Sequence, residues 1–465
     1  MSFEDYFLFK APNYRSSTLT NGIGRSGQRA LLYATGMDEE DLKKPFVAVI
    51  GSFSEMVPGH AHLRELAEAV CQGVIKGGGV PRRSETIAIC DGLCQGHKGM
   101  CYPLASRDLI ADSVEMVVEA HHFDAMVLLP GCDKIIPGML MAAARVDIPA
   151  IVVPGGPMLP GNVGGNPLFC SSELREFPGR VEAGVITPEY MKGGGKAHPA
   201  HGGQLRPSGD GQFHVYAHRG AGHGAARLRH GPGGVQQAQA HRQGQRPGGD
   251  GAAAAGDHPP ADSHPDDVLK TLESPQKAEG GIAVLWGNLA PRGAVVKQSG
   301  VRESMYRFTG RARVFDSMEE ADAAVSAGSI EKGTVIVIRY EGPKGGPGMR
   351  EMLSTTALIM GRGMDRDVAL VTDGRFSGAT HGPCIGHISP EAAAGGPIAF
   401  VKDGDVIHID ITNRTLTIDV TEEEFARRRE GWTPVRKPRM TALAKYATLV
   451  SGADTGAVAD RNRLD

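Results

Sequence analysis

The sequence of 465 residues contains no uninterrupted apolar run near the ~18 residues that a membrane-spanning helix needs. Its N-terminus carries Glu4 and Asp5, where a secretory signal peptide would be basic. The formal net charge is only −3 at pH 7, so the chain lacks the positive excess that would attract a nucleic acid or an anionic membrane. These absences predict a cytoplasmic protein that binds neither membranes nor nucleic acids.

The sequence also lacks the even number of cysteines that a closed set of disulfides requires. It has seven, and four of them cluster beside glycines and carboxylates: Cys90, Cys94, Cys101 and Cys132. Such a cluster indicates free thiols or metal ligands in a reducing compartment rather than a disulfide framework.

Residues 192–265 contain no Ile, no Glu and no Cys, although they hold nine of the 17 histidines. Gly, Ala, Arg, Pro, His and Gln predominate, and this composition cannot bury enough apolar surface to fold. A histidine-rich metal tract or a basic RNA-binding segment would need ligand spacing or interleaved aromatic residues, which are missing. The composition is typical of a GC-rich gene translated out of frame, so we interpret the segment as disordered or out of frame. Sequencing the coding DNA would test this hypothesis.

Outside that segment the apolar pattern is regular. Before it, apolar runs predict strands that alternate with helices, namely strands at 46–50, 86–90, 125–129 and 150–153 and helices at 27–36, 60–75 and 107–120. This alternation indicates a parallel sheet with right-handed crossovers. After it, we expect strands at 281–288, 293–297, 334–339 and 368–372, a helix at 317–327 and antiparallel strands within 397–420.

The sequence therefore predicts an α/β protein in three parts. Residues 1–191 form an N-terminal α/β domain with a parallel sheet. The family resemblance described below implies that this domain is incomplete and that it carries the cluster and magnesium ligands. Residues 192–265 form the disordered or out-of-frame segment. Residues 266–465 form a C-terminal β-rich, barrel-like α+β domain that carries the serine base discussed below.

Each predicted N-terminal strand leads into a loop rich in glycine and polar residues. Because such loops meet at one edge of a parallel sheet, they predict a single polar site. His60, His62 and His97 lie in these loops and are candidate ligands or acid-base groups, although loop packing or a hydrogen bond is the simpler interpretation.

Cys132, Asp133 and Lys134 stand between a predicted strand and a predicted helix. A thiolate suits iron or zinc and a carboxylate suits Mg²⁺ or Mn²⁺, so two unlike metals side by side are one interpretation. The alternative is a buried cysteine and an aspartate that caps the helix. Asp91 also follows a predicted strand, so it either shares a hard cation with Asp133 or is a solvated turn residue.

Ser377 has no Gly-x-Ser-x-Gly frame and no local His-Asp partners, which disfavours an acyl-transfer triad. A serine can act as a base where a nearby cation stabilises its alkoxide. The alternative is a loop serine that bonds to its own backbone.

Taken together, the loops resemble those of the dihydroxy-acid dehydratase and phosphogluconate dehydratase family. Val-Pro-Gly-His, Gly-Cys-Asp-Lys-Ile and Asp-Gly-Arg-Phe-Ser-Gly are among the shared motifs. The matching segments, in family order, are 57–60, 91–100, 103–107, 131–141, 155–158, 342–349 and 372–378. The resemblance extends over about residues 15–190 and 266–460.

The resemblance implies a dehydratase that converts 2,3-dihydroxy-3-methyl carboxylic acids into 2-oxo acids in valine and isoleucine biosynthesis. It implies an iron-sulfur cluster, [2Fe-2S] or [4Fe-4S], with Cys132 as one ligand. It also implies Mg²⁺ held by Asp91, Asp133, Glu351 and a carbamylated Lys134, with Ser377 as the general base. A small-molecule substrate and a homo-oligomer, a dimer, are the implied partners.

Two departures from the family pattern carry expectations of their own. Gly59 stands where some members carry a cysteine, so the sequence leaves the cluster type open. A Cys-Gly-Ser-Cys-like loop is expected near residue 200, where residues 198–203 read His-Pro-Ala-His-Gly-Gly. We therefore weigh two alternatives: a sugar-acid dehydratase of the same family, and a catalytically inactive remnant that lacks the second cysteine loop.

Overall fold

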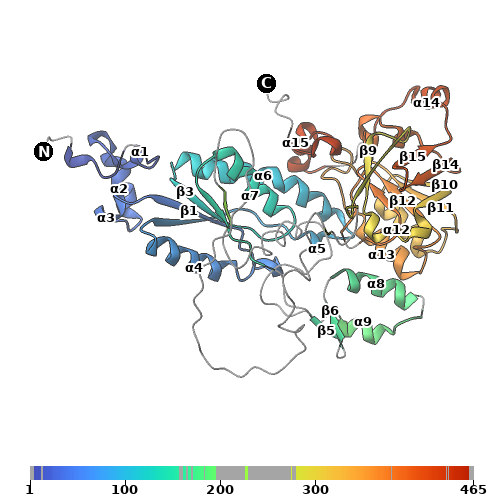
Figure 1. Ribbon diagram of the computed structural model, residues 1–465, viewed down its shortest axis with the longest axis horizontal. Coiled ribbons are helices and arrows are strands. Elements are labelled where there is room, and N and C mark those ends of the chain that lie inside the picture. Colours follow the sequence, from blue (N-terminus) through green and yellow to red (C-terminus); the bar gives the residue numbers. More distant parts are fainter. Residues whose placement is uncertain are drawn as a thin grey trace.

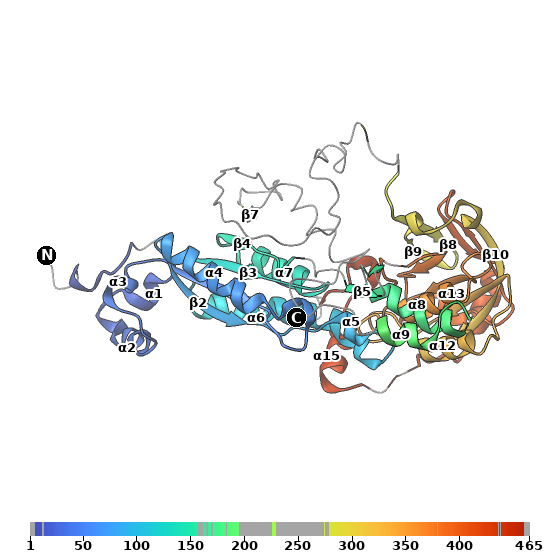
Figure 2. The same ribbon diagram turned by 90° about the horizontal axis from the view of Figure 1, so that it is seen from below.

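The computed structural model describes most of the chain outside the middle segment. The described residues are 5–11, 14–156, 161–163, 166–168, 171–182, 184–194, 226–228, 274, 279–378, 380–435, 437 and 439–459. They form an elongated molecule, with an α/β sheet domain at one end and a β barrel at the other (Figures 1 and 2). Among these residues, no helix is both long and apolar enough to cross a bilayer.

The N-terminal domain is built on a five-stranded sheet that is parallel except at one edge. Its strand order is β2 (Val80–Glu85), β1 (Phe46–Gly51), β3 (Ala125–Leu129), β4 (Ala150–Val152) and β7 (Ala226–Leu228), and β7 alone is antiparallel to its neighbour. The central strands β1 and β3 are almost continuous apolar runs because helices cover both of their faces. This confirms the predicted parallel α/β sheet.

Alternate residues of β1 and β3 pack on opposite faces of the sheet. On one face they contact α6 (Tyr102–Ala120) and α7 (Ile135–Val146) through a large apolar core. On the other face they contact α4 (Leu63–Lys76) through a smaller core. The loops at the carboxyl ends of these strands lead toward the barrel (Figure 1).

The strand predicted at 86–90 is wrong. The structure places strand β2 just before it, where Val80 pairs with Phe46 of β1. β2 lies at the edge of the sheet, where one side of the strand needs no hydrogen-bond partner, so it tolerates a proline and arginines. These residues interrupt the apolar pattern from which a strand is predicted. The apolar run at 86–90 is instead an irregular connection that ends in the buried Cys90.

The C-terminal domain is a closed eight-stranded barrel. Its strands, in barrel order, are β10 (Arg307–Phe315), β11 (Thr334–Ile338), β12 (Ala369–Thr372), β13 (Cys384–Gly386), β9 (Ala290–Val296), β8 (Ala283–Gly287), β15 (Thr415–Ile418) and β14 (Val406–Asp410). Buried aliphatic side chains fill the interior. The barrel-like prediction is therefore confirmed, although residues 397–400 form a short 3₁₀ helix rather than a strand.

Several helices pack outside the barrel. α12 (Met318–Ser326) and α13 (Leu353–Gly361) cover β11 and β12 through a second apolar core. α8 (Ser171–Glu182) packs closely on α13, and a Cβ added to Gly179 would lie 3.0 Å from the Gly361 Cα. Figure 2 shows α8 and α9 (Pro188–Gly194) beside the barrel rather than beside the sheet.

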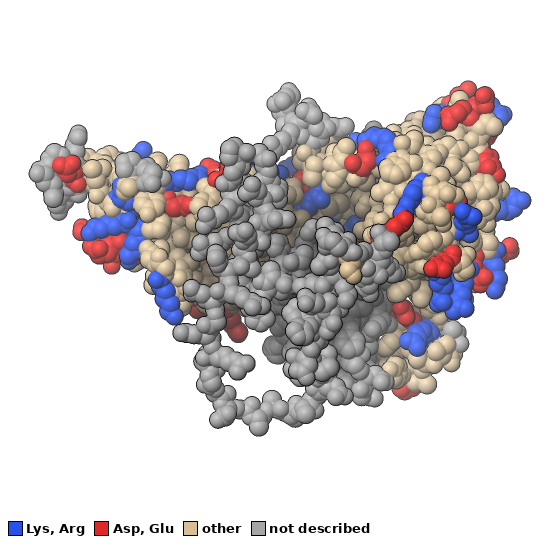
Figure 3. Space-filling view, in the orientation of Figure 1, with Lys and Arg blue, Asp and Glu red and all other residues tan. Residues whose placement is uncertain are grey.

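Charged side chains are mixed over the described surface. Figure 3 shows Lys and Arg interspersed with Asp and Glu at both ends of the face in view. The mixture agrees with the small net charge of −3.

Candidate active site between the sheet and the barrel

Three carboxylates, from both domains, lie close enough to interact. Asp91 is the first residue of α5 (Asp91–Cys94), and Asp133 lies in the loop between β3 and α7. Glu351 comes from the barrel domain, two residues before α13. Asp91 is hydrogen-bonded to Asp133 and also interacts with the charge of Glu351. We call these three residues the acidic cluster.

Two cations and an amide bond to the acidic cluster, and two of these three residues link the domains. Arg375 of the barrel domain donates hydrogen bonds to Asp133 Oδ2 at 3.4 Å and to Glu351 Oε2 at 2.9 Å. Lys134 forms an ion pair with Asp133, and Gln95 Nε2 donates to Glu351 Oε1 at 2.7 Å. Because two of these residues bond across the domain boundary, the cluster is complete only when the domains are docked.

The surroundings separate the pKa values of the two aspartates. Burial raises the pKa of Asp91 well above its ordinary value, and the charges of Asp133 and Glu351 raise it further. Burial opposes ionisation of Asp133 as well, but Lys134 and Arg375 outweigh it and lower the pKa of that carboxyl to about 2. Asp91 is therefore the carboxyl of this pair that keeps its proton to the higher pH.

The acidic cluster offers the oxygen ligands that Mg²⁺ prefers. Within the described ranges, no three His, Cys, Asp or Glu side chains already converge at metal-binding distance. The carboxylates instead form ion pairs with Lys134 and Arg375, whose positive charges occupy the place that a divalent cation would take. The donor set therefore fits Mg²⁺ in its chemistry, and Lys134 would add an oxygen ligand only as a carbamate.

Cys132 and Cys90 form a thiol pair beside the acidic cluster. Cys132 follows β3 with a left-handed backbone (φ 58°), and its thiol is hydrogen-bonded to that of Cys90. This hydrogen bond and burial raise the pKa of the Cys132 thiol well above its ordinary value. Thiolates are the ligands that iron-sulfur groups require, so the chemistry of this position fits the predicted role of Cys132.

Ser377 lies two residues beyond Arg375, in the loop that follows β12. Its carbonyl accepts a hydrogen bond from the Thr380 amide at 3.0 Å, and Lys297 donates one to the neighbouring Gly378 carbonyl. The contacts of Arg375 with the acidic cluster place this loop at the domain junction. The base role of Ser377 stays a prediction.

The three histidines singled out in the sequence are each bonded to a backbone carbonyl. The pairs are His60 Nδ1 with Ser52 at 2.5 Å, His62 Nε2 with Gly155 at 2.9 Å, and His97 Nε2 with Leu93 at 2.9 Å. These bonds favour the interpretation that the histidines shape the loops.

Several residues of the site received no specific role from the sequence, and Cys90 was noted only as one of the four clustered cysteines. Arg375 lies within a motif that was noted for its serine, and Cys90 and Gln95 flank the α5 segment that was noted for Asp91. His387 was missed entirely: its ring centroid lies 5.8 Å from that of Phe376. Burial, with Arg375 and Lys134 nearby, lowers the pKa of His387 to about 4, so its imidazole is neutral. In the sequence, only their positions near Asp91 and Ser377 could have pointed to Cys90 and Arg375.

Two further buried carboxylates hold the barrel loops that face the site. Asp373 accepts hydrogen bonds from the Glu341 amide at 2.9 Å and the Ala392 amide at 2.8 Å. Glu391 accepts from the Lys344 amide at 3.0 Å. These bonds fix the glycine-rich loop at 342–349.

Glu391→Gln is expected to flatten the pH dependence of stability. Burial, and then Asp373, raises the pKa of Glu391 from 4.5 to about 7. Between these values the folded chain binds more protons than the unfolded chain, so the free energy of unfolding falls as the pH rises from 4.5 to about 7. The expected fall is about 3 kcal/mol. Urea unfolding across this range measures it.

The matched control is Glu430→Gln, at an exposed glutamate that ends α14 (Glu422–Arg429). This substitution should leave the change of unfolding free energy with pH as it is in the wild type. If the unfolding free energy of Glu391→Gln changed with pH as in the wild type, the raised pKa would not belong to Glu391.

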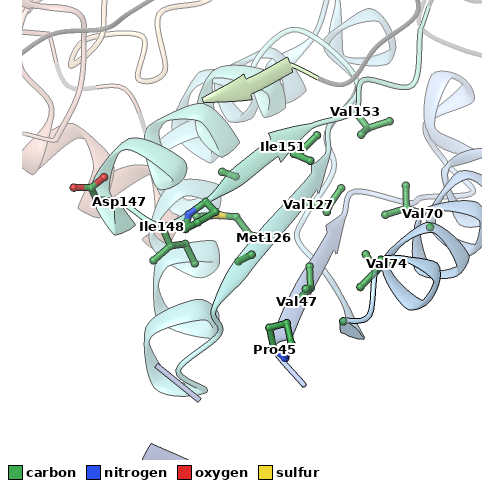
Figure 4. Close-up of a pocket in the computed structure, with 16 residues that line it drawn as sticks. Pro45, Val47, Val70, Val74, Met126, Val127, Asp147, Ile148, Ile151 and Val153 are labelled. Carbon is green, nitrogen blue, oxygen red and sulfur yellow. The ribbon is translucent and has the colours of Figure 1, made fainter. Parts of the chain in front are cut away.

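An apolar cavity lies apart from this site. It measures about 970 Å³ and lies between α4 and the strands β1, β3 and β4. Figure 4 shows Val47, Val127 and Val153 on its sheet wall, with Val70 and Val74 facing them from α4. Its lining contains none of the acidic cluster, so it is not part of the candidate active site.

Buried carboxylates, thiols and cations gather at the junction of two domains, and such a junction between a sheet and a barrel is typical of the active site of an enzyme. Two family profiles match the chain. Residues 44–202 match the dihydroxy-acid/6-phosphogluconate dehydratase N-terminal domain, and residues 267–457 match the C-terminal domain.

Curated relatives match nearly the whole chain. A protein named dihydroxy-acid dehydratase 1 from Methanosarcina acetivorans is 40% identical, over 96% of this chain and 100% of its own. A dihydroxy-acid dehydratase from Pyrococcus furiosus is 40% identical, over 96% and 99% of the two chains. The chain therefore belongs to the dihydroxy-acid/6-phosphogluconate dehydratase family, and it is a dehydratase, an enzyme of the hydro-lyase class.

Two other findings qualify the comparison. The alignment with the Methanosarcina relative runs over 552 residues, more than the 465 of this chain, so the relative has internal segments without a counterpart here. Among solved structures, a MccF-like protein from Streptococcus pneumoniae in complex with AMP matches 81% of this chain and 99% of its own at 8% identity, with a TM-score of 0.15. That likeness is too low to carry an argument.

Proposed function

We propose that the chain converts 2,3-dihydroxy-3-methyl carboxylic acids into 2-oxo acids, as a dehydratase of valine and isoleucine biosynthesis. The observation that carries the proposal is the acidic cluster, which both domains build and which Arg375 bonds on its two sides. The 40% identity to proteins named dihydroxy-acid dehydratase supports the substrate class. The proposal includes a cytoplasmic homodimer, which rests on the family resemblance.

The proposed ligands form two sets, one of oxygen ligands for a hard cation and one of sulfur for a soft metal group. Asp91, Asp133, Glu351 and a carbamylated Lys134 would hold Mg²⁺, and Cys132 would hold the iron-sulfur group. When bound, these groups supply the Lewis acidity that polarises the substrate carboxylate and the C3 hydroxyl. Ser377, as its alkoxide, takes the proton from C2 and the C3–O bond breaks. The leaving hydroxide takes up the proton held by Ser377, so it departs as water and the alkoxide is restored. The resulting enol tautomerises to the 2-oxo acid.

Two alternatives have observations of their own. The matching profiles also cover 6-phosphogluconate dehydratases, so a sugar acid is the second substrate candidate. The histidine-rich segment at 192–265, the missing cysteine loop and the segments present only in the longer relative favour an inactive remnant. The histidine-rich segment lies almost entirely outside the described residues.

The deciding experiment is iron and sulfide analysis of anaerobically purified protein, with an assay of 2-oxo acid formation. The assay uses 2,3-dihydroxy-3-methylbutanoate and, separately, 6-phosphogluconate, each with and without Mg²⁺. We expect bound iron and sulfide and Mg²⁺-dependent turnover of the branched substrate. Turnover of the sugar acid alone would transfer the proposal to the second substrate class. Absence of both cluster and turnover would establish the remnant.

A further inference from the structure

Two Cys-Asp dipeptides meet where the N-terminal sheet faces the barrel. One is Cys90-Asp91, at the start of α5, and the other is Cys132-Asp133, just after β3. The two thiols are hydrogen-bonded to each other, and so are the two carboxyl groups. The loops thus place a pair of soft ligands beside a pair of hard ligands, and each loop contributes one residue to each pair.

The backbone fixes both thiols. Cys132 has φ 58°, a left-handed conformation that a residue other than glycine adopts only where its surroundings enforce it. Cys90 directly precedes α5, and its carbonyl accepts a hydrogen bond from the Cys94 amide at 3.2 Å. Cys90 is 5% exposed. Burial therefore keeps its thiol away from solvent, and the hydrogen bond to Cys132 places it beside that thiol.

Other cysteines in the described part of the chain have different surroundings. Cys101 donates a hydrogen bond to the Gly346 carbonyl at 3.0 Å, at the contact with the barrel loop. Cys71 is buried between α4 and the sheet, and Cys384 is buried in the barrel domain. Cys94 interacts with the charge of Cys90, but the thiol that is hydrogen-bonded to Cys132 is that of Cys90.

We propose that Cys90 is the second thiolate ligand of the soft-metal group at this site, and that it binds together with Cys132. The inference rests on the proposed function, because that function supplies an iron-sulfur group. Iron-sulfur clusters and other soft-metal sites are held by several thiolates rather than one. Each thiol releases its proton to solvent as its sulfur binds the metal. Asp91 and Asp133 stay available to the hard cation.

The first test compares iron content in the full chain after anaerobic reconstitution with ferrous iron and sulfide. Cys90→Ser should lower the iron bound per chain and the visible absorption of the cluster at least tenfold, as should Cys132→Ser. Cys71→Ser is the matched control, because it also places a hydroxyl at a buried cysteine. Thermal unfolding of each apo variant shows whether the fold has survived.

The second test uses Cd²⁺ alone, so it needs neither a cluster nor turnover. Sulfur-to-cadmium charge-transfer absorption of the reduced apo chain reports the number of thiolates on the metal. The wild type and Cys71→Ser should show two thiolates per bound cadmium, and Cys90→Ser should show half that intensity. An unchanged intensity in Cys90→Ser, or a Cys90–Cys132 disulfide that persists in reductant and excludes cadmium, would overturn the inference.

The outcomes separate this inference from the proposed function. Iron and turnover that are unaltered in Cys90→Ser would reject Cys90 as a ligand and leave the dehydratase intact. A two-thiolate cadmium signal in a chain that takes up no iron and has no turnover would support the thiol pair and reject the proposed function.

Discussion

Ser377→Ala is expected to lower turnover of 2,3-dihydroxy-3-methylbutanoate about 10²–10⁴-fold, the usual contribution of a positioned general base. Arg375, two residues earlier in the same loop, bonds Asp133 and Glu351, so this loop reaches the site from the barrel side. The Lys297 ammonium beside the Gly378 carbonyl adds positive charge that favours an alkoxide. The measurement is kcat at saturating substrate and Mg²⁺, with iron, sulfide and Mg²⁺ contents determined on the same sample.

The metal contents distinguish a base from a structural residue. Because the alanine removes only an oxygen, both the cluster and the Mg²⁺ should remain at wild-type amounts. Ser329→Ala is the control: its hydroxyl donates to the Ala324 carbonyl at 2.9 Å, beyond the end of α12. Near-normal turnover in Ser377→Ala would refute the base assignment, and loss of metal with turnover would point to a role in the fold.

Gly348→Ala is expected to destabilise the chain by about 3–5 kcal/mol and to abolish turnover. Gly348 has φ 86°, and a Cβ added there would lie 1.9 Å from the Cys101 carbonyl oxygen. That oxygen belongs to the N-terminal domain, whereas Gly348 belongs to the glycine-rich loop of the barrel domain. The added methyl group therefore forces the two domains apart at the site. Urea unfolding and the same turnover assay measure the effect.

Gly404→Ala is the control that separates the cost of a left-handed backbone from the cost of the close domain contact at Gly348. Gly404 has nearly the same φ, 88°, but lies in an exposed turn where an added Cβ meets nothing within 4 Å. Its replacement should cost only about 1–2 kcal/mol, the penalty of a left-handed backbone for an L-residue. Equal losses in the two variants would show that the domain contact at Gly348 contributes nothing.

The sequence predicted those parts of the fold in which burial controls the pattern. β1 and β3 are buried on both faces, so their apolar runs marked them, and β3 was predicted with its observed bounds. β2 was missed because an edge strand can be polar and can contain proline. The C-terminal domain was predicted as β-rich and barrel-like, but the order of its strands was not, because closure depends on pairings such as β10 with β14, between segments far apart in the sequence.

In the site, too, the sequence predicted only part of the arrangement. Asp91 and Asp133 were expected to meet because loops at the carboxyl edge of a parallel sheet converge, even though the strand before Asp91 was misplaced. No local pattern shows that Arg375 bonds both Asp133 and Glu351, since that contact depends on how two domains dock. The thiol contact between Cys90 and Cys132 was missed because spacing in the sequence does not show which way a side chain points.

The acidic cluster joins residues that the ribosome makes at very different times. Gln95 and Glu351, which share a hydrogen bond, are 256 residues apart in the chain. Asp91 and Asp133 leave the ribosome long before Arg375, because the N-terminal part of a protein is made and begins to fold first. The nascent chain thus carries a pair of carboxylates without their guanidinium counterion.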